Sequence, residues 1–204
     1  RDLVVLIEGR AQSILKGERL ALNFMQRMSG IATQTREMVD LIEGTKCKLL
    51  DTRKTTPGIR YMEKWAVKIG GGHNHRFALY DMIMIKDNHI DYAGGIEAAI
   101  LNTRKYLADS GKNLKIEVEA RNMEEVIEIM RVGGIHRIML DNFTPAETLE
   151  AVKLIKGKFE TESSGGITIQ NIRIYAECGV DYISVGALTH SVKSLDLSLK
   201  AIEE

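Results

Sequence analysis

Short apolar runs alternate with amphipathic helical segments along the chain. The runs that predict strands are Cys47–Leu50, Met82–Ile85, Leu114–Val118, Arg137–Leu140, Thr161–Ser163 and Tyr182–Val185. The segments between them repeat apolar residues at intervals of three and four, as one face of a helix does; they include Ile59–Ile69, Met123–Val132, Ala146–Lys156 and Ile169–Cys178. This alternation predicts repeated strand–helix units around a parallel sheet.

Capping residues and the N-terminal region refine this outline. Asn122, Thr144 and Thr168 each place a side-chain oxygen at the entrance of a predicted helix. A long helical region is expected from residue 18 to residue 43, with a break at Ser29-Gly30. The chain opens on Arg1, and residues 3–7 have the composition of a strand already under way. We therefore expect further sequence to precede this chain.

Polar residues follow the predicted strands at one end only. The segments that stand there are Asp51-Thr52-Arg53-Lys54, Lys86-Asp87-Asn88-His89, Glu119, Asp141-Asn142, Ser164-Gly165-Gly166 and Gly186-Ala187. In a parallel α/β barrel the carboxyl ends of all strands share one face, and that face carries the active site. The sequence therefore predicts a barrel with its chemistry at these strand ends.

Composition excludes several classes of function. Hydrophobic residues make up 44% of the 204 residues and charged residues 27%, as in an ordinary globular protein. Lys plus Arg equals Asp plus Glu at 28 each, so net charge gives no argument for binding nucleic acid or a membrane surface. The apolar runs are much shorter than the ~20 residues of a bilayer helix. Cys47 and Cys178 lack metal-ligand spacing, which predicts buried, reduced thiols in a cytoplasmic protein.

Cations are concentrated between residues 51 and 89. Four of them stand at strand ends or in a glycine-rich loop, where binding sites are built: Arg53, Lys54, Arg76 and Lys86. Three others recur at helical spacing and are interpreted as a solvated helix face: Arg60, Lys64 and Lys68. The first group predicts an anion-binding mouth.

Histidines accompany this group of cations. Gly70-Gly71-Gly72 precedes His73, His75 and Arg76, which would let the backbone approach a ligand closely. A core histidine is the alternative for His75. Metal ligation by the histidines is disfavoured because no Cys or carboxylate stands at a recognisable ligand spacing.

Two further features suit a sugar phosphate. Glu119 and Asp141 follow neighbouring strands, and such carboxylates could hold Mg²⁺ together with substrate phosphates; pairing with Lys or Arg in the same mouth is the alternative. Residues 164–166 and 186–187 stand where barrels bind a phosphate in their last two loops. Tight turns that need glycine are the alternative there.

Taken together, these segments resemble quinolinate phosphoribosyltransferase. The resemblance runs in order through nearly the whole chain and is carried by Glu18-Arg19 with Leu22-Asn23-Phe24, Ser29-Gly30-Ile31-Ala32-Thr33, the run from Asp51 to Gly58, Gly70-Gly71-Gly72 with Asn74-His75-Arg76, Ile85-Lys86-Asp87-Asn88-His89, Leu140-Asp141-Asn142, Ser164-Gly165-Gly166-Ile167 and the run from Ser184 to Thr189. One departure is Ser163, where the resemblance leads us to expect Ala beside Ser164.

The resemblance implies a fold, an assembly and a reaction. The fold would be an incomplete, TIM-like α/β barrel, with residues 21–204 as the barrel and residues 1–20 as the remnant of a smaller N-terminal α/β domain and its linker. The assembly would be a homodimer or higher oligomer in which Arg19 reaches the neighbouring subunit's site. The reaction would transfer the phosphoribosyl group of phosphoribosyl pyrophosphate (PRPP) to quinolinate with loss of CO₂, giving nicotinate mononucleotide for NAD. It would need Mg²⁺ and no organic cofactor.

The resemblance also assigns roles to residues of this sequence. The catalytic residues would be Lys54, Lys86, Glu119 and Asp141, with Mg²⁺ on the last two. The substrate-binding residues would be Arg19, Thr52, Arg53, His75, Arg76, Lys86 and His89. The phosphates of PRPP would lie on Lys54, Ser164, Gly165, Gly166, Gly186 and Ala187.

Two other functions stay open at this point. A phosphoribosyltransferase of the same barrel type could act on nicotinate, although the surplus of cations favours a diacid. A non-catalytic barrel that binds a phosphometabolite is the second possibility, and the presence of both Glu119 and Asp141 argues against it.

Overall fold

The computed structural model describes residues 2–202 and contains the predicted succession of strands and helices. The strands are β1 (Lys48–Leu50), β2 (Ile83–Ile85), β3 (Ile116–Ala120), β4 (Arg137–Asp141), β5 (Glu160–Ser164) and β6 (Tyr182–Ser184). The helices are α1 (Ala11–Leu41), α2 (Arg60–Ile69), α3 (Asp87–Ala93), α4 (Ile96–Asp109), α5 (Met123–Val132), α6 (Pro145–Ile155), α7 (Ile172–Glu177) and α8 (Ala187–His190). The six strands predicted for the sheet are confirmed to within two residues at each end.

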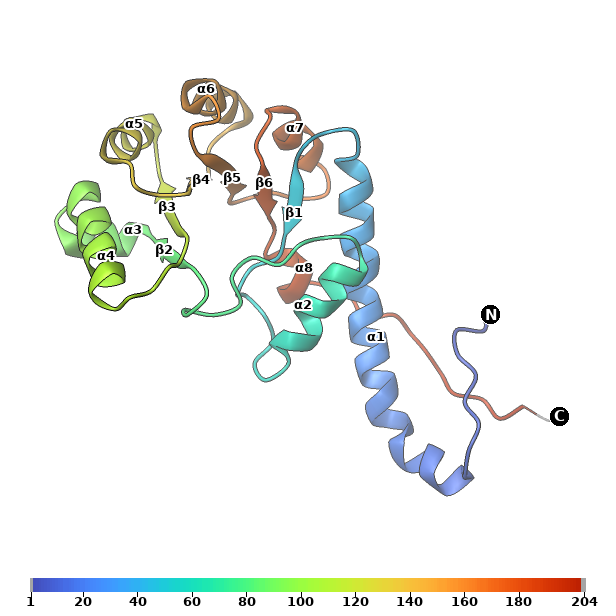
Figure 1. Cartoon of the computed structure of the whole chain (residues 1–204). Coiled ribbons are helices and arrows are strands. Elements are labelled where there is room, and N and C mark those ends of the chain that lie inside the picture. Colours follow the sequence, from blue (N-terminus) through green and yellow to red (C-terminus); the bar gives the residue numbers. More distant parts are fainter. Residues whose placement is uncertain (1, 203–204) are drawn as a thin grey trace.

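The six strands form one parallel sheet in the order β1-β6-β5-β4-β3-β2. The sheet curves into an arc with helices α4, α5, α6, α7 and α1 along its outer side (Figure 1). In the described part of the chain β1 and β2 do not pair with each other, and a bridge between Leu50 and His73 extends the β1 edge instead. The incomplete parallel barrel is thereby confirmed.

Alternation along the strands separates an apolar outer layer from a polar interior. On β3, Ile116, Val118 and Ala120 belong to the hydrophobic cluster shared with the outer helices. Successive side chains of a strand point to opposite faces, so Glu117 and Glu119 face the barrel interior. A second hydrophobic cluster joins α1, β1, β6 and the helices beside them. The core that stabilises the fold therefore surrounds the barrel, and the interior is left for polar groups.

Helix α1 differs from its prediction. It runs for 31 residues without a break at Ser29-Gly30. Gly30 is needed for packing, because a Cβ there would overlap the Lys193 carbonyl of the C-terminal segment. The predicted strand at residues 3–7 is also wrong: that segment has no regular secondary structure and is exposed beside the free half of α1 (Figure 1). Within residues 2–202 its apolar residues pair with no strand.

The predicted helix starts are confirmed at α5 and α6. The Asn122 side chain accepts a hydrogen bond from Glu125 N at 2.9 Å, and Thr144 forms a reciprocal capping box with Glu147. The third start was wrong: Thr168 lies in a turn in which its N–H donates to Asn171 Oδ1 at 2.7 Å, and α7 begins only at Ile172.

Three findings bear on the remaining expectations. No helix within residues 2–202 is long and apolar enough to cross a membrane. Cys47 and Cys178 are both buried and unpaired, as predicted, and burial raises the pKa of Cys47 to about 12. Helix α1 continues through residues 20 and 21 without interruption, and the domain boundary placed there stays a prediction.

Candidate active site

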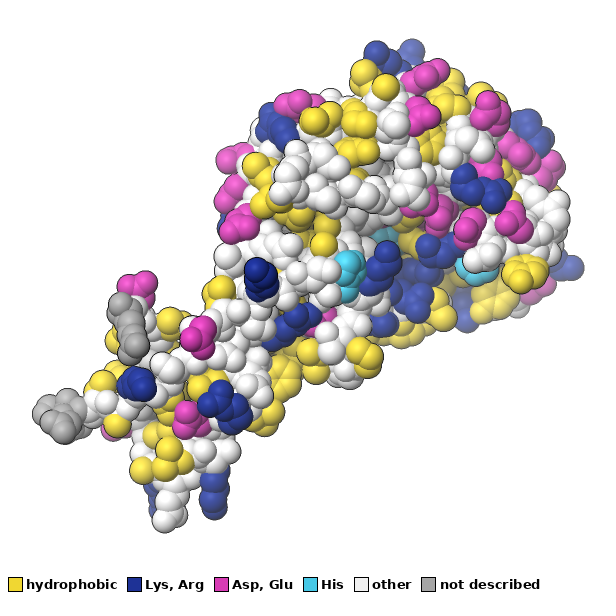
Figure 2. All heavy atoms as spheres, turned by 180° about the vertical axis from the view of Figure 1, so that it is seen from behind, with side chains coloured by type: hydrophobic (Ala, Val, Ile, Leu, Met, Phe, Trp, Pro, Cys, Tyr) yellow, Lys and Arg dark blue, Asp and Glu magenta, His cyan; other side chains and the backbone are white. Residues whose placement is uncertain are grey.

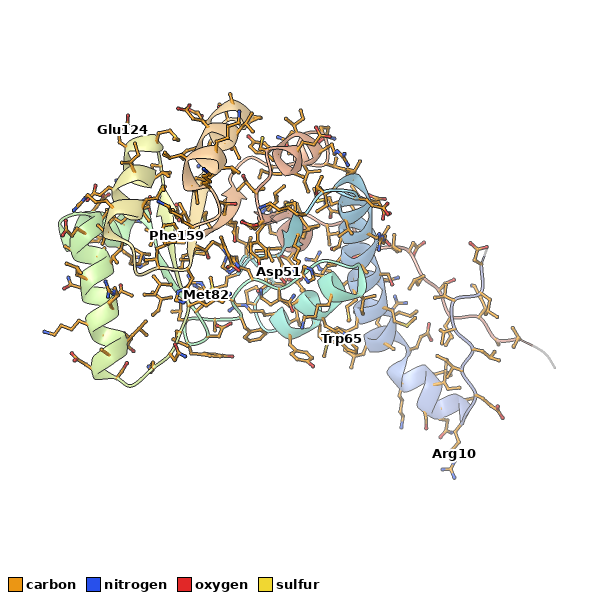
Figure 3. The ribbon with its side chains drawn as sticks, turned by 45° about the horizontal axis from the view of Figure 1, so that its top comes forward. Arg10, Asp51, Trp65, Met82, Glu124 and Phe159 are labelled. Carbon is orange, nitrogen blue, oxygen red and sulfur yellow. The ribbon has the colours of Figure 1, made fainter. Side chains whose placement is uncertain are left out.

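The loop after β1 is fixed by a buried carboxylate. Asp51 forms an ion pair with Lys64 of α2 and accepts hydrogen bonds from Asn74 Nδ2 at 2.6 Å and His75 N at 2.9 Å. Figure 3 shows Asp51 in the middle of the molecule, above α2 in that view. Burial raises the pKa of Asp51, while the Lys64 charge opposes that rise. Asp51 therefore ties the β1 loop to the histidine segment.

The interpretation of α2 as a solvated cationic face was wrong for two of its three members. Lys64 is 2% exposed, and its Nζ also donates to His75 O at 3.1 Å. Arg60 is half-buried and donates to Thr55 Oγ1, Phe77 O and Arg53 O. Only Lys68 is exposed as predicted. Arg60 and Lys64 face the site loops because α2 packs against those loops.

A second buried carboxylate holds the next part of this loop and was missed by sequence reasoning. Glu63 is fully buried and accepts hydrogen bonds from Thr56 N at 2.9 Å and Thr56 Oγ1 at 2.8 Å. Arg27 of α1 bonds the same carboxylate at 2.8 Å. A Glu preceding a Lys on an amphipathic helix gives no signal of such a role, since most such residues are solvated.

Two of the predicted cations, Arg53 and Arg76, lie near each other. Arg76 donates to Met82 O at 3.3 Å, and burial together with the charge of Arg53 lowers the pKa of Arg76. The Arg53 Nε is buried and has no hydrogen-bond partner among the described residues. Figure 2 shows Lys, Arg and His side chains gathered around a hollow in the surface. Guanidinium groups crowded in this way suit a ligand that carries several negative charges.

The two predicted carboxylates lie on the same face. Glu119 Oε2 is 3.0 Å from Lys86 Nζ, so Glu119 pairs with a lysine of the mouth. Burial raises the pKa of Asp141, and the charges of Lys86 and Lys54 offset part of that rise. Asp141 also accepts a hydrogen bond from Asn142 Nδ2 at 2.6 Å. Oxygen donors of this kind fit a hard divalent cation, because each carboxylate keeps an oxygen beyond these contacts.

The last two strand ends form tight, glycine-dependent loops. Gly165 has φ +89°, and a Cβ there would overlap the Asn142 side chain. A Cβ on Gly186 would lie 3.1 Å from Lys54 Cδ, so the lysine chain crosses this glycine directly. Thr189 Oγ1 donates to Lys54 O at 2.8 Å and holds the backbone of the lysine. Lys54 and the loop of Gly186 and Ala187 are thus brought together.

The predicted histidines take different positions. His75 is 8% exposed and lies 3.0 Å from Glu117 inside the barrel. His89 is exposed, and its Nδ1 accepts a hydrogen bond from Lys86 N at 2.9 Å, which fixes the turn into α3. His73 lies at the β1 edge. His75 and Arg76 also line a cavity that reaches Arg137 at the amino end of the lumen.

Two predicted binding residues are placed less directly. The Thr52 hydroxyl accepts a hydrogen bond from Lys54 N at 3.1 Å and shapes the lysine turn. Arg19 is exposed on the free half of α1, which projects from the barrel. The roles of both in binding stay predictions.

Relatives of known sequence match nearly the whole chain. The chain is 48% identical to quinolinate phosphoribosyltransferase [decarboxylating] 2, mitochondrial, of Nicotiana glauca, over 95% of this chain and 59% of that protein. It is 47% identical to the probable nicotinate-nucleotide pyrophosphorylase [carboxylating] of Bacillus subtilis, over 97% of this chain and 67% of that protein. The chain spans about three fifths of the length of the plant relatives.

Solved structures agree with the fold. The crystal structure of NadC from Streptococcus pyogenes superposes with a TM-score of 0.88 at 43% identity, over 95% of this chain and 66% of that chain. Nicotinate-nucleotide pyrophosphorylase from Ehrlichia chaffeensis gives a TM-score of 0.84 at 45% identity, over 90% and 65%. The sequence model of the quinolinate phosphoribosyl transferase C-terminal domain matches residues 31–200. The chain therefore belongs to the quinolinate phosphoribosyl transferase family.

Proposed function

We propose that this chain is the catalytic barrel of an enzyme that transfers the phosphoribosyl group of PRPP to quinolinate. The products would be nicotinate mononucleotide, CO₂ and pyrophosphate, and the pathway would be NAD synthesis. The observation that supports the proposal is that predicted site residues lie near one another in two groups. Lys86 Nζ is 3.0 Å from Glu119 Oε2 and its charge acts on Asp141, while the charge of Arg53 acts on Arg76. Family membership supports the same reaction, since relatives of both plants and bacteria bear the corresponding names.

The substrates explain the charge of the mouth. Quinolinate carries two adjacent carboxylates, and PRPP carries a 5′-phosphate and a pyrophosphate. Arg53 and Arg76 offer planar forks for the carboxylates, and the buried, unpartnered Nε of Arg53 is a donor that a carboxylate would satisfy. Lys54, beside Gly186, would bind a phosphate together with residues 164–166.

The chemistry would proceed in two stages. The pyridine nitrogen attacks the anomeric carbon while the bond from that carbon to pyrophosphate breaks, and the ring nitrogen becomes cationic. The bond from carbon 2 to its carboxylate then breaks, CO₂ leaves, and the cationic ring stabilises the electron pair left on carbon 2. A proton completes the product. Lys86 is our candidate donor, because it is half exposed at the mouth, whereas the ring of His75 faces the buried acids.

Mg²⁺ would be held by the free oxygens of Glu119 and Asp141 together with substrate phosphates. When bound, it would offset the charge of the departing pyrophosphate. The same carboxylates would favour positive charge on the ribose as the leaving group departs. No organic cofactor is required, since the cationic ring nitrogen itself stabilises the electron pair left on carbon 2.

The assembly would be a homodimer or higher oligomer, with Arg19 acting in the neighbouring subunit's site. The exposed position of Arg19 on the projecting half of α1 supports this arrangement. We also propose a cytoplasmic location, which the two unpaired cysteines support. No nucleic acid or membrane would be involved.

Carbon dioxide release tests the reaction. The protein would be incubated with Mg²⁺, PRPP and quinolinate labelled in its 2-carboxylate, and labelled CO₂ would be counted. We expect release only when PRPP is present, because decarboxylation needs the cationic ring. Release without PRPP would contradict the order of steps. Binding of nicotinate as tightly as quinolinate would favour the one-acid alternative, since Arg53 and Arg76 would then not be reading a second carboxylate.

A further inference from the structure

A cluster of ionisable residues lies buried in the barrel interior, below the candidate mouth. Glu117 and Glu162 are fully buried, and His75 and Arg137 are each 8% exposed. They come from β3, β5, the loop before β2, and β4. The proposed reaction uses neither carboxylate. Burying charged side chains is costly because they lose their hydration, so buried charges of this kind suggest a specific role.

The lower side of the cluster is an ion-pair network. Arg137 Nη1 donates to Glu162 Oε2 at 2.7 Å and lies 3.8 Å from Glu117 Oε1. The Arg137 guanidinium also stacks on the Tyr182 ring at 3.8 Å. Arg137 thus provides one fixed positive charge for the two carboxylates.

The upper side of the cluster is the His75 ring. Its Nε2 lies 3.0 Å from Glu117 Oε2 and 3.4 Å from Glu162 Oε2, between the two acids. Within residues 2–202, Nε2 forms no well-aligned hydrogen bond with either acid. One N–H on Nε2, placed between two acceptors, accounts for this geometry.

The other ring nitrogen connects the cluster to the mouth. His75 Nδ1 accepts a hydrogen bond from Arg76 N at 2.7 Å, and the Arg76 guanidinium then reaches Met82 O. An acceptor nitrogen carries no proton. Burial lowers the pKa of His75, but Glu117 and Glu162 outweigh this effect and raise the pKa to about 9. The Arg76 N–H, in contrast, opposes a proton on Nδ1. The 2.7 Å hydrogen bond keeps Nδ1 unprotonated, because an imidazolium would set its Nδ1–H against the Arg76 N–H.

Glu117 can reduce the net charge of the cluster by binding a proton. Burial, followed by the neighbouring charge of Glu162, raises the pKa of Glu117 to about 7. Glu162, bonded to Arg137, keeps its charge despite burial. The cluster can therefore approach neutrality without a second proton on His75.

We propose that Glu117 and Glu162 are positioning residues that hold His75 as its Nε2–H tautomer, so that Nδ1 fixes the backbone of Arg76 and aims its guanidinium at the substrate carboxylate. The part that concerns quinolinate rests on the proposed function. The part that concerns the tautomer does not, since it depends only on the four buried side chains and Arg76 N.

His75, Glu117 and Glu162 also have the spacing of a metal site, since one potential ligand atom from each lies within 4.8 Å of the others. Arg137 argues against a cation there. Its guanidinium already occupies the Glu162 oxygen nearest to His75. A divalent ion in this position would meet a fixed positive charge.

Two substitutions of His75 separate the roles of its two nitrogens. Asn places an amide oxygen near the Nδ1 position, and Gln places its amide group near the Nε2 position. We expect His75→Gln to weaken quinolinate affinity at least tenfold more than His75→Asn does. Calorimetric titration of the whole chain measures both. A loss that is equal in the two variants would overturn the proposal.

His136 offers the matched control. Its Nδ1 accepts a hydrogen bond from Ile116 N at 3.0 Å, at the opposite end of the barrel. His136→Gln breaks the same kind of bond, so it should leave the quinolinate dissociation constant unchanged. A tenfold loss in this control as well would show that the effect is general destabilisation, and would overturn the positional argument.

The tautomer is tested separately by ¹⁵N NMR of the histidine ring at pH 7. We expect Nδ1 of His75 at the shift of an unprotonated nitrogen and Nε2 at that of a protonated one, unchanged by Zn²⁺. Two protonated nitrogens, a proton on Nδ1 alone, or displacement of both signals by Zn²⁺ would overturn the proposal. If the tautomer is as expected but wild-type protein does not bind quinolinate, the proposed function fails and the buried arrangement stands.

Discussion

Arg53 is the residue on which the candidate site depends most directly. Its buried Nε has no protein partner among the described residues, and its charge acts on Arg76. We expect Arg53→Ala to weaken quinolinate binding by roughly 2 kcal/mol or more, the scale of a hydrogen bond to a charged group. Isothermal titration gives this difference. Lys68→Ala, on the exposed side of α2, is the control. An unchanged dissociation constant for Arg53→Ala would refute its assignment.

Ser163 is a residue whose hydroxyl group should destabilise the fold. It is 1% exposed, and its hydroxyl has no hydrogen-bond partner in the described part of the chain. Replacing it by Ala removes a buried unsatisfied group, so Ser163→Ala should raise the free energy of unfolding by about 1 kcal/mol. Urea denaturation measures the change. Ser110→Ala, which removes a bonded and exposed hydroxyl, should give no such gain.

At the scale of elements, two glycines of α1 provide a paired experiment. A Cβ on Gly30 would lie 3.1 Å from Lys193 C and 3.3 Å from Ser194 Cα, whereas nothing lies within 4 Å of a Cβ on Gly17. Gly30→Ala should therefore lower the free energy of unfolding by about 1–3 kcal/mol through overpacking. Gly17→Ala should raise it by up to about 1 kcal/mol through helix propensity. Similar changes in both would mean that the C-terminal segment does not pack on α1.

Asp181 joins two strand–helix units through its carboxylate. It accepts hydrogen bonds from Lys46 Nζ at 2.7 Å, Thr161 N at 2.8 Å and Thr161 Oγ1 at 2.9 Å. Burial raises the pKa of Asp181, but the hydrogen bonds from Lys46 and Thr161 outweigh this effect and lower the pKa. A lowered folded-state pKa adds stability above the unfolded value of about 3.9, and this stability is lost as the pH falls below it.

Asp181→Asn should accordingly cost about 1 kcal/mol near neutrality, a value reduced for solvent screening, and should flatten the loss of stability below pH 4. Unfolding curves between pH 6 and pH 3 measure this. Asp40→Asn breaks an exposed pair within α1 and should change the curve less. An equal pH dependence in wild type and Asp181→Asn would contradict the role of this carboxylate.

Strand and helix positions could be predicted because local pattern determines them. Polar groups at strand ends, such as Glu119 and Asp141, could be placed on one face because parallel strands share their direction. The surroundings of Lys64 and Glu63 could not be predicted, because they depend on which side of the barrel α2 covers. That choice is made by packing between distant segments, as is the burial of Glu117 and Glu162.

At the scale of the whole molecule, the proposal that Arg19 acts in a neighbouring subunit can be tested by mixing variants. Arg19→Ala and Lys86→Ala would each be inactive alone. In a mixed dimer one site would receive an intact Lys86 and an intact Arg19. Random exchange of subunits should then restore about a quarter of wild-type activity. No recovery, with subunit exchange verified by mass spectrometry, would contradict action across the interface.

The placement of apolar packing outside the barrel and charged groups within it carries a cost for the protein. The lumen around Glu117, Glu162 and Arg137 opposes folding, since buried ion pairs seldom repay their lost hydration. Hydrophobic side chains of similar volume would make the barrel more stable but would remove its interior charges. Selection for stability and selection for activity thus pull these interior positions in opposite directions.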